Sequence, residues 1–315
     1  MCLPATMTSS TFWNLLFISV FAGLTISYKG AKNDNVAYVT TRAMLVGATF
    51  LTFYVVVCQT FMSSKAFNAP AYANRITVEE GSFEEDIPTV SDLKKIPLMD
   101  SDTAYMIGNR AIGELTNVVS QFRPAGYATI IDNGKVVKVA PLLYNSYWKW
   151  KSNKHNGVPG YVIVDPETGE AQYVKLETGM KYSPSAFFEQ DVVRHARTNF
   201  PNKHFGNRIF QLDDAGTPYW TIMTETPQTL FSAKKPDGLI IMNAITGECE
   251  WYEISDIPEW IDLAIEGKDV IKLYNDYGRL QQGYWNSVLA QRGCTKATND
   301  YGYIAIGNDI CISSI

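Results

Sequence analysis

Histidine and cysteine, the side chains that most often ligate metals or act as nucleophiles, are few and widely separated in this chain. The histidines are His155, His195 and His204, and none lies in an HExxH motif or another metal-binding spacing. The five cysteines include no CxxC pair, so neither a zinc site nor a disulfide framework is indicated. GxSxG, GxGxxG and the Walker phosphate loop do not occur either. We therefore predict no catalytic residue, no metal site and no cofactor, and a role other than that of an enzyme.

The segment Asp165–Glu170 (DPETGE) holds three acidic residues, which suggests a calcium loop. An EF-hand loop needs oxygen ligands at alternate positions over about twelve residues, and apolar residues follow here instead. The same segment is typical of a tight turn, in which Pro166 presets φ and Gly169 takes a positive φ. The side chains of Asp165 and Thr168 would then bond the turn backbone. We favour the turn.

Aromatic side chains gather at residues 144–151 (YNSYWKWK), where Tyr147, Trp148 and Trp150 alternate with lysines. On an outward-facing strand, such residues hold a sugar or a peptide, or lie against a membrane surface. The simpler interpretation is that the rings pack against a neighbouring strand and the lysines face water. Tyr147, Trp148 and Trp150 are the predicted binding surface if one exists here.

Two stretches that begin 78 residues apart are versions of one another. Gly160–Leu176 is GYVIVDPETGEAQYVKL, and Gly238–Ile254 is GLIIMNAITGECEWYEI. Each has an apolar strand, Asp or Asn, two variable residues, Thr-Gly-Glu and an alternating strand, which together predict a hairpin. A repeat of this period indicates arrayed supersecondary units.

The residues before the first copy predict a helix and another hairpin. From Ala104 to Phe122, apolar residues recur every three or four positions, which is typical of a single helix of about five turns. Asp100–Asp102 supplies residue types that cap helix N-termini. Asp132–Gly134 (DNG) predicts a tight hairpin turn, because Asn-Gly accommodates the positive φ values that such turns need.

The same order of elements recurs before the second copy. Ser183 and Pro184 are typical of a helix start, and an apolar stripe continues from there to Phe200. His195 lies beside this stripe, so we predict a structural role for it rather than metal ligation. Another hairpin is predicted to turn at Asp213–Gly216.

A third unit begins at Pro258 and includes a predicted strand at Gly302–Ile306, but no third Thr-Gly-Glu turn follows before Ile315. We expect either that the chain is truncated within this unit or that its last residues depart from the native reading frame, since an unpaired strand edge is a liability. The predicted fold class is α+β, with two N-terminal transmembrane helices followed by tandem helix-plus-antiparallel-sheet units. The predicted parts are a transmembrane hairpin 1–62, an acidic linker 63–97, a first unit 98–178, a second unit 179–255 and an incomplete third unit 256–315.

A helix, a hairpin and a final strand–DxxTGE–strand together resemble the PepSY domain family. The resemblance rests on Val164–Ala171 (VDPETGEA) and, more loosely, on Met242–Cys249 (MNAITGEC), where Asn-Ala replaces Asp-Pro. It covers residues 100–255 well and 256–315 in part.

This resemblance implies an α+β fold with a helix laid on an antiparallel sheet, usually outside the cytoplasmic membrane. It also implies regulatory, inhibitory or interaction roles near peptidases and cell-wall machinery, in a membrane-anchored protein of Gram-positive bacteria. The family pattern supplies no catalytic residues.

Two uncharged apolar segments, 12–27 and 44–62, predict transmembrane helices, because a helix needs about 20 apolar residues to cross a bilayer. A targeting segment is the alternative for the first, although residues 1–12 contain no Lys or Arg. The loop between the segments has three basic residues against two just after the second segment. The lipid bilayer is therefore a predicted partner, with the large C-terminal part extracytoplasmic at the cell membrane.

The rest of the chain is acidic. The net charge is −5, and residues 1–75 hold five basic side chains and one acidic, which leaves −9 from residue 76 onward. Such a part repels phosphate backbones, so we predict no nucleic acid partner. We predict a non-enzymatic binding or regulatory module for an unknown protein or peptide, acting by strand addition at an open sheet edge. An inhibitory pro-segment or regulatory part of an envelope peptidase, and a structural spacer array, are the alternatives.

Overall fold

The computed structural model describes several stretches of the chain and a few isolated positions between 20 and 54; the stretches are 61–82, 99–113, 115–132, 135–229, 232–298, 301–306 and 309–314. The chain divides into two compact units. The larger comprises Thr77–Glu225, Pro236–Tyr274 and Ala297–Ile315, and the smaller comprises Met1–Ile76, Thr226–Lys235 and Asn275–Lys296. The domain boundaries predicted from the sequence remain predictions.

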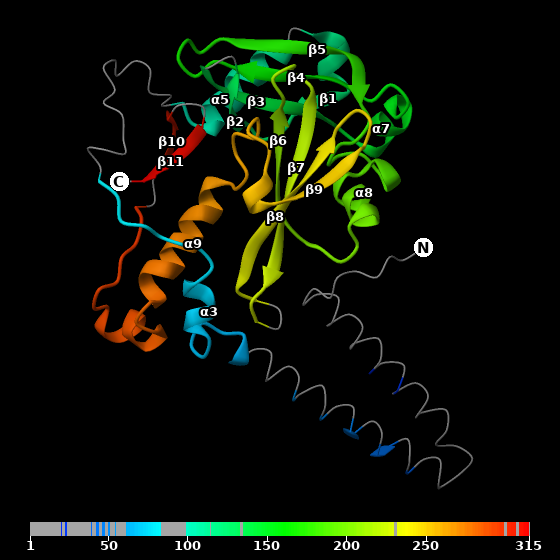
Figure 1. Cartoon of the computed structure of the whole chain (residues 1–315). Coiled ribbons are helices and arrows are strands. Elements are labelled where there is room, and N and C mark those ends of the chain that lie inside the picture. The colour runs from blue at the N-terminus through cyan, green and yellow to red at the C-terminus, as the bar shows by residue number, and fades with distance from the viewer. Residues whose placement is uncertain are drawn as a thin grey trace. The chain divides into compact units, whose positions relative to one another are not determined.

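The first sheet of the larger unit is antiparallel throughout. Strands β1 and β2 both pair with β3, which pairs with β4, and β4 pairs with β5, so that β5 is an edge strand (Figure 1). The strands are β1 (Phe122–Pro124), β2 (Ala128–Asp132), β3 (Lys135–Tyr144), β4 (Val158–Val164) and β5 (Ala171–Met180).

The second sheet repeats this up-and-down arrangement in the order β6-β7-β8-β9. Its strands are β6 (His204–Leu212), β7 (Pro218–Pro227), β8 (Lys234–Asn243) and β9 (Cys249–Glu253). A separate two-stranded sheet is formed by β10 (Tyr301–Ile306) and β11 (Asp309–Ser314).

The helices for which bounds can be given are short. They are α3 (Ala69–Ala73), α5 (Ser101–Gly113), α6 (Thr116–Val119), α7 (Tyr147–Asn153), α8 (Val192–Asn199) and α9 (Gly267–Leu280). Single turns of other helix types occur at η2 (Phe188–Gln190), η3 (Ile254–Asp256) and η4 (Asn286–Ala290).

The two larger sheets share one apolar core. Val162 and Val164 of β4 point to the same face of their strand and are fully buried, as are Ile240 and Met242 of β8. Trp220 of β7 belongs to the same cluster. Burying one such aliphatic side chain contributes about 1.5–3 kcal/mol, so this shared core is a main source of stability for the larger unit.

The predicted fold class was wrong in two respects. The described residues form mostly antiparallel sheets with few helices, so helices contribute less than an α+β prediction implies. Moreover, no helix among the described residues has the length and apolar character needed to cross a membrane. Helix α9 has only 14 residues, several of them charged, whereas a span needs about 20 apolar ones. The two predicted transmembrane helices are therefore not supported, and most of 12–27 and 44–62 lies outside the described residues.

The single helix predicted from Ala104 to Phe122 is two helices and a strand. Helix α5 ends at Gly113, α6 follows as one turn, and Phe122 begins β1. Phe122 pairs with Tyr144 of β3, and their rings lie 5.3 Å apart. Glycine is a poor helix former, so the helix ends at Gly113, and the chain that follows pairs with β3 through β1.

The second predicted helix starts later than expected. Ser183 does not cap it; instead Asp191 does, with its side chain accepting a hydrogen bond from the Arg194 N–H at 2.8 Å. Asp191 has an extended conformation that suits an N-cap, so α8 begins at Val192. Phe188 lies in the preceding turn η2 and outside the helix.

The predicted turns of the two repeat copies are confirmed. Gly169 and Gly247 have φ of +73° and +82°, values that favour glycine. The Asp165 side chain accepts hydrogen bonds from the N–H groups of Glu167 at 2.7 Å and Thr168 at 3.2 Å. In the second copy, Asn243 does the same for the two corresponding amides, so Asn replaces Asp without loss of the turn.

Two further hairpins are also confirmed. Asp132 of β2 lies opposite Lys135 of β3, which leaves a two-residue loop that falls outside the described residues. Leu212 of β6 lies opposite Pro218 of β7. The side chain of Asp213 accepts from the N–H of Thr217 at 2.7 Å and closes this second loop.

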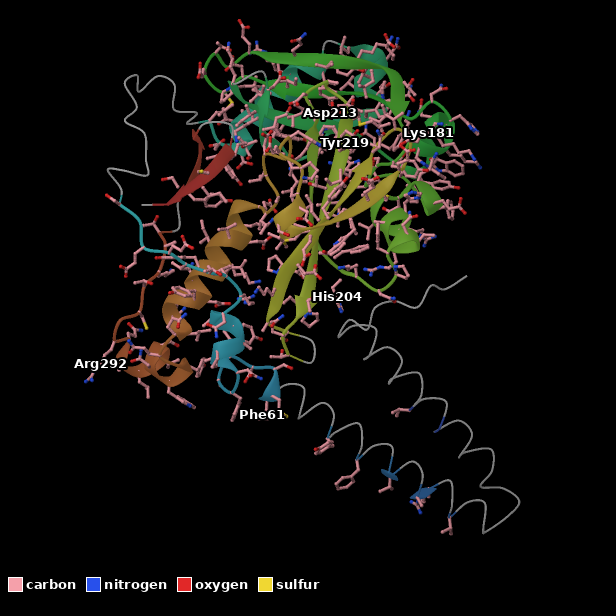
Figure 2. All side chains as sticks on the ribbon, in the orientation of Figure 1. Phe61, Lys181, His204, Asp213, Tyr219 and Arg292 are labelled. Atoms are coloured by element: carbon pink, nitrogen blue, oxygen red, sulfur yellow. The ribbon has the colours of Figure 1, made fainter. Side chains whose placement is uncertain are left out.

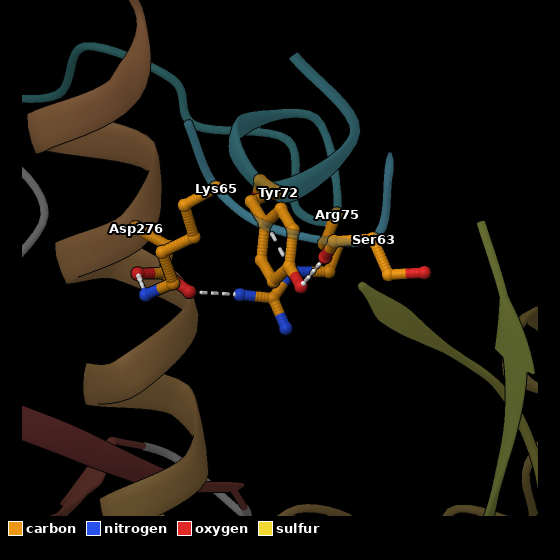
Figure 3. Close-up of polar contacts among 5 residues, drawn as sticks. All are labelled: Ser63, Lys65, Tyr72, Arg75 and Asp276. Carbon is orange, nitrogen blue, oxygen red and sulfur yellow. Dashed lines mark hydrogen bonds and ion pairs between the residues drawn. The ribbon is translucent and has the colours of Figure 1, made fainter. Parts of the chain in front are cut away.

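The smaller unit holds a cluster of charges around one carboxylate. Asp276 of α9 pairs with both Lys65 and Arg75, although its side chain is only 10% exposed (Figure 3). The Tyr72 ring lies beside both cations, and its hydroxyl donates to the Ser63 carbonyl at 2.6 Å. Lys65, Tyr72 and Arg75 are thus packed together with Asp276 in this unit.

Candidate functional site

The predicted aromatic surface lies on a helix rather than on a strand. Tyr147, Trp148 and Trp150 belong to α7, whose N-cap Ser146 accepts a hydrogen bond from the Lys149 N–H at 3.4 Å. A capped segment of this kind takes the helical period of 3.6, so the alternation of Trp and Lys does not place them on opposite faces. Trp150 is buried, Tyr147 is half-buried and Trp148 is 68% exposed.

Helix α7 packs against the turn η2. The Tyr147 ring lies 5.0 Å from the Phe187 ring, and the Trp150 ring lies 5.4 Å from Phe187 and 5.7 Å from Phe188. Trp150 Nε1 also donates to Gln190 Oε1 at 2.8 Å. Trp150 is therefore an internal anchor for the rings around it. We call the outer rings the aromatic patch: Tyr147, Trp148, Phe187 and Phe188.

A groove of about 570 Å³ runs between α5 and the edge strand β5. We call it the α5–β5 groove. The helical wall is lined by Ile107, Arg110, Ala111 and Leu115. The strand wall is lined by Gly169, Ala171, Gln172 and Tyr173. Gly169 is the glycine of the first repeat turn, so the groove begins where the repeat hairpin turns.

The strand wall of this groove presents backbone groups. Among the described strands, β5 pairs with β4 alone, and the Asp165 N–H donates to the Glu170 carbonyl at 2.9 Å. Residue pairs that are hydrogen-bonded and pairs that are not alternate along an antiparallel ladder. Gln172, two positions after Glu170, is therefore hydrogen-bonded to β4. The N–H and C=O of Ala171 and Tyr173 therefore point away from β4, outward from the edge of the sheet.

The helical wall offers apolar contacts and one charge. Ile107 and Ala111 lie one turn apart on α5, and Leu115 lies just before α6. All three are half-buried and line the groove, so they form an apolar stripe along this wall. Arg110 is exposed in the last turn of α5. The groove thus combines an unpaired strand edge, an apolar flank and a guanidinium group.

A second cavity of about 460 Å³ lies between the two larger sheets, and Arg208, Lys268 and Tyr303 are among its lining residues. Glu266, the acidic residue of this lining, is already engaged, because it accepts from the Asn207 side chain at 3.0 Å and pairs with Lys268 at 2.8 Å. The α5–β5 groove is the better candidate site, since its polar groups face outward and lack such internal partners among the described strands.

In the part of the chain that the structure describes, no group of three or more His, Cys, Asp or Glu side chains could hold a metal. His195 Nε2 lies 2.8 Å from the Gly247 carbonyl oxygen, and its ring stacks 4.4 Å from Tyr182. His195 therefore fastens the second repeat turn to α8, which confirms its structural role.

Cys249 is expected to be unreactive. Burial raises the pKa of its thiol to about 11, and the Sγ contacts the Gly247 carbonyl oxygen at 3.3 Å. About 0.1% of the thiol is then ionised at pH 8, and the thiolate is the reactive form. With the other four cysteines replaced by serine, alkylation of Cys249 by iodoacetamide should stay slow at pH 8 and rise tenfold per pH unit up to about 11. Rapid alkylation at pH 8 would contradict the burial that raises this pKa.

Sequence reasoning found the aromatic residues but missed the groove. The signal for it was present in two parts, the apolar stripe of the first helix and the alternating strand that follows the first Thr-Gly-Glu turn. Neither part shows which strand ends up at a sheet edge, because strand order depends on pairing across the whole chain.

No family model, no curated protein and no solved structure matches this chain.

Proposed function

We propose that this protein is a peptide-binding module that captures an extended segment of a partner along the edge of β5. The observation that carries the proposal is the groove itself, in which an edge strand with outward backbone groups faces an apolar helix flank. An extended chain laid in such a groove adds a strand to the sheet, gaining affinity from main-chain hydrogen bonds and selectivity from side-chain pockets.

The walls indicate what kind of segment fits. Side chains of an added strand alternate between the two faces of the sheet, so every second one would point toward α5. There it would meet the stripe of Ile107, Ala111 and Leu115, which favours aliphatic side chains of modest size. Arg110 at the same wall favours a carboxylate on the bound segment, because a guanidinium pairs with a carboxylate through two parallel hydrogen bonds.

The residues that line the groove support the binding of a peptide rather than a chemical reaction. Tyr173, which lines the strand wall, has its pKa raised by burial and so remains a neutral phenol near pH 7. The resemblance to PepSY domains, with their regulatory and interaction roles, agrees with this proposal. The partner, in this view, is a protein or peptide with an exposed extended segment.

The decisive experiment compares two prolines in adjacent positions. Ala171→Pro removes an N–H that points toward the groove, and proline is tolerated at the first residue of a strand. We expect it to fold with a melting temperature within a few degrees of the parent, and to weaken peptide binding at least tenfold through the lost hydrogen bond and the added ring. Gln172→Pro removes a bond to β4 and should instead lower the melting temperature clearly.

The probe is a pool of randomised heptapeptides displayed on phage and selected on the immobilised full chain. Peptides enriched on the parent but not on Ala171→Pro, and bound at least tenfold more weakly by that variant in fluorescence anisotropy, are the expected result. Equal enrichment on both proteins, or no enrichment on the parent, would show that this edge does not bind peptides.

The charge of Arg110 provides a further check on the same pool. We expect peptides selected on the parent to carry Asp or Glu near one end, and Arg110→Glu to select peptides with Lys or Arg there instead. Exposed Arg110 contacts solvent rather than the core, so the reversal should leave stability almost unchanged. If peptides selected on Arg110→Glu still carry Asp or Glu at that end, the Arg110 guanidinium does not contact the peptide carboxylate.

A further inference from the structure

The aromatic patch is an exposed apolar surface made of large rings. Trp148, Phe187 and Phe188 are 68%, 40% and 57% exposed, and they extend from one short helix and one turn. Scattered exposed apolar residues are ordinary, but a contiguous set of large rings marks an interaction site. Neither of the two cavities described above includes any of these rings in its lining.

The backbone at the patch is held in a conformation that brings a ring outward. Phe188 has a φ of +57°, a left-handed value that a bulky residue rarely adopts. The neighbouring residues hold it there, because the Gln190 N–H donates to the Phe187 carbonyl and the Gln190 side chain bonds both Trp150 and the Lys154 carbonyl. Local strain of this kind, kept in place by surrounding bonds, is typical of functional surfaces.

The charges around the patch have the sign opposite to that of the whole protein. Lys149 and Lys151 lie on α7, and Lys154 follows it. Lys181, labelled in Figure 2, follows the last residue of β5. The acidic residue of the same two segments, 145–156 and 181–190, is Glu189. With four lysines and one glutamate, these two segments carry a formal charge of +3, in a chain whose net charge is −5.

We propose that the aromatic patch is a docking surface for an anionic lipid bilayer. Protruding aromatic rings insert at the level of lipid headgroups, where an amphipathic ring has one side in apolar surroundings and the other in water. A cluster of lysines beside them is attracted to acidic headgroups. Lys151, whose Nζ lies 5.4 Å from the Trp148 ring centroid, places the two kinds of group side by side.

A bilayer fits these features better than a peptide does. A peptide bound by strand addition needs backbone groups at a strand edge, which the α5–β5 groove offers, whereas the patch is made of side chains on a helix and a turn. A bilayer needs no groove, because the rings enter it and the cations stay at its surface. The protein would thus dock through α7 and η2, independently of any peptide held at β5.

The test follows the environment of one position on α7 in the full chain. Ser152 is exposed on α7 and lies outside the patch. With the native cysteines replaced by serine, Ser152→Cys is labelled with the fluorophore NBD, whose emission rises when it leaves water. Asp214→Cys, in the exposed turn between β6 and β7, is labelled in the same way as a control. Vesicles of phosphatidylcholine alone, or with one-third phosphatidylglycerol, are then added.

We expect NBD emission at position 152 to rise severalfold only with the vesicles that contain phosphatidylglycerol. The emission should fall back in 0.5 M salt, because ions screen the attraction between the lysines and the acidic headgroups. The signal at position 214 should not change. The double change Lys149→Glu and Lys151→Glu should weaken the response at least tenfold, as should Trp148→Ala with Phe188→Ala. Because the readout is local, vesicle binding by another part of the chain would not produce it.

An absent response at position 152 would overturn the proposal, as would an equal response in the two double variants. An equal rise with neutral vesicles would also overturn it, since the lysines would then have no part in binding. If an acidic, tryptophan-containing peptide changes NBD emission at position 152 and the vesicles do not, the patch is a protein-binding surface instead.

Discussion

Replacing Gly160 by alanine is expected to lower the free energy of unfolding of the larger unit by about 3 kcal/mol, with a similar loss for Gly238→Ala. Both glycines occupy the same position in the two repeat copies. A Cβ on Gly160 would collide with the carbonyl oxygen of Val174 on β5, and would lie 2.9 Å from the Tyr173 ring. Since the first obstacle is backbone, the hairpin itself would have to move.

The second copy shows the same arrangement with a different aromatic residue. A Cβ on Gly238 would collide with the Tyr252 carbonyl oxygen and would lie 2.6 Å from Trp251 Nε1. In each copy the glycine leaves room for an aromatic ring from the partner strand to lie across it, a packing known to compensate for glycine in strands. This explains in physical terms why both copies of the repeat begin with Gly.

Urea unfolding measures this loss, and Gly126→Ala is the matched control. No atom lies within 4 Å of a Cβ placed on Gly126, and its φ is not in the left-handed region. Alanine there should be neutral or stabilising by about 0.5 kcal/mol, because it restricts the unfolded chain. A loss of unfolding free energy under 1 kcal/mol for both Gly160→Ala and Gly238→Ala would contradict the close backbone contacts described at these glycines.

Replacing Asp276 by alanine is expected to destabilise the smaller unit by about 3–5 kcal/mol. Asp276 is the shared partner of Lys65 and Arg75, and the Arg75 side chain is only 7% exposed. Without the carboxylate, the Arg75 guanidinium would remain buried with no compensating charge, which costs far more than losing a surface ion pair. Lys65, at 42% exposed, can turn to water and should contribute little to the loss.

Hydrogen exchange separates this effect from general unfolding. In Asp276→Ala, amides in 61–76 and 275–296 should exchange faster, while those of β3, β4 and β8 in the larger unit keep their protection. Lys65→Ala is the matched control, and it should change exchange by much less. The double variant Arg75→Met with Asp276→Leu removes both buried charges and should recover most of the stability. Equal exchange in parent and Asp276→Ala would contradict the buried cluster.

Local features were predictable from the sequence. The turns at Asp165–Gly169 and Asn243–Gly247 depend on residues within five positions of one another, so their chemistry is visible in the chain. The same is true of the hairpin loop at Asp213, whose side chain bonds amides two and four residues away. Each of these predictions needed no knowledge of the rest of the fold.

The features that failed depend on residues far apart. Phe122 fits a helical stripe, yet it becomes a strand because Tyr144 lies opposite. Trp148 was identified, but Phe187 and Phe188, which complete the patch, lie about 40 positions later in the chain. The pairing of Arg75 with Asp276 joins residues 201 positions apart and has no local signal either. Propensity and pattern give no signal for such pairings.

The ion pair between Lys65 and Asp276 also has a consequence for synthesis, since it joins residues 211 positions apart. A ribosome adds about 5–20 residues per second, so about 10–40 s separates the emergence of these two side chains. Throughout that interval the larger unit can begin to form its hairpins, because each hairpin closes between residues that are near in sequence. The segment that contains Lys65 and Arg75 meanwhile lacks the Asp276 carboxylate. The smaller unit thus cannot complete this ion pair until Asp276 emerges late in synthesis, and until then Lys65 and Arg75 lack the carboxylate that compensates for their charge.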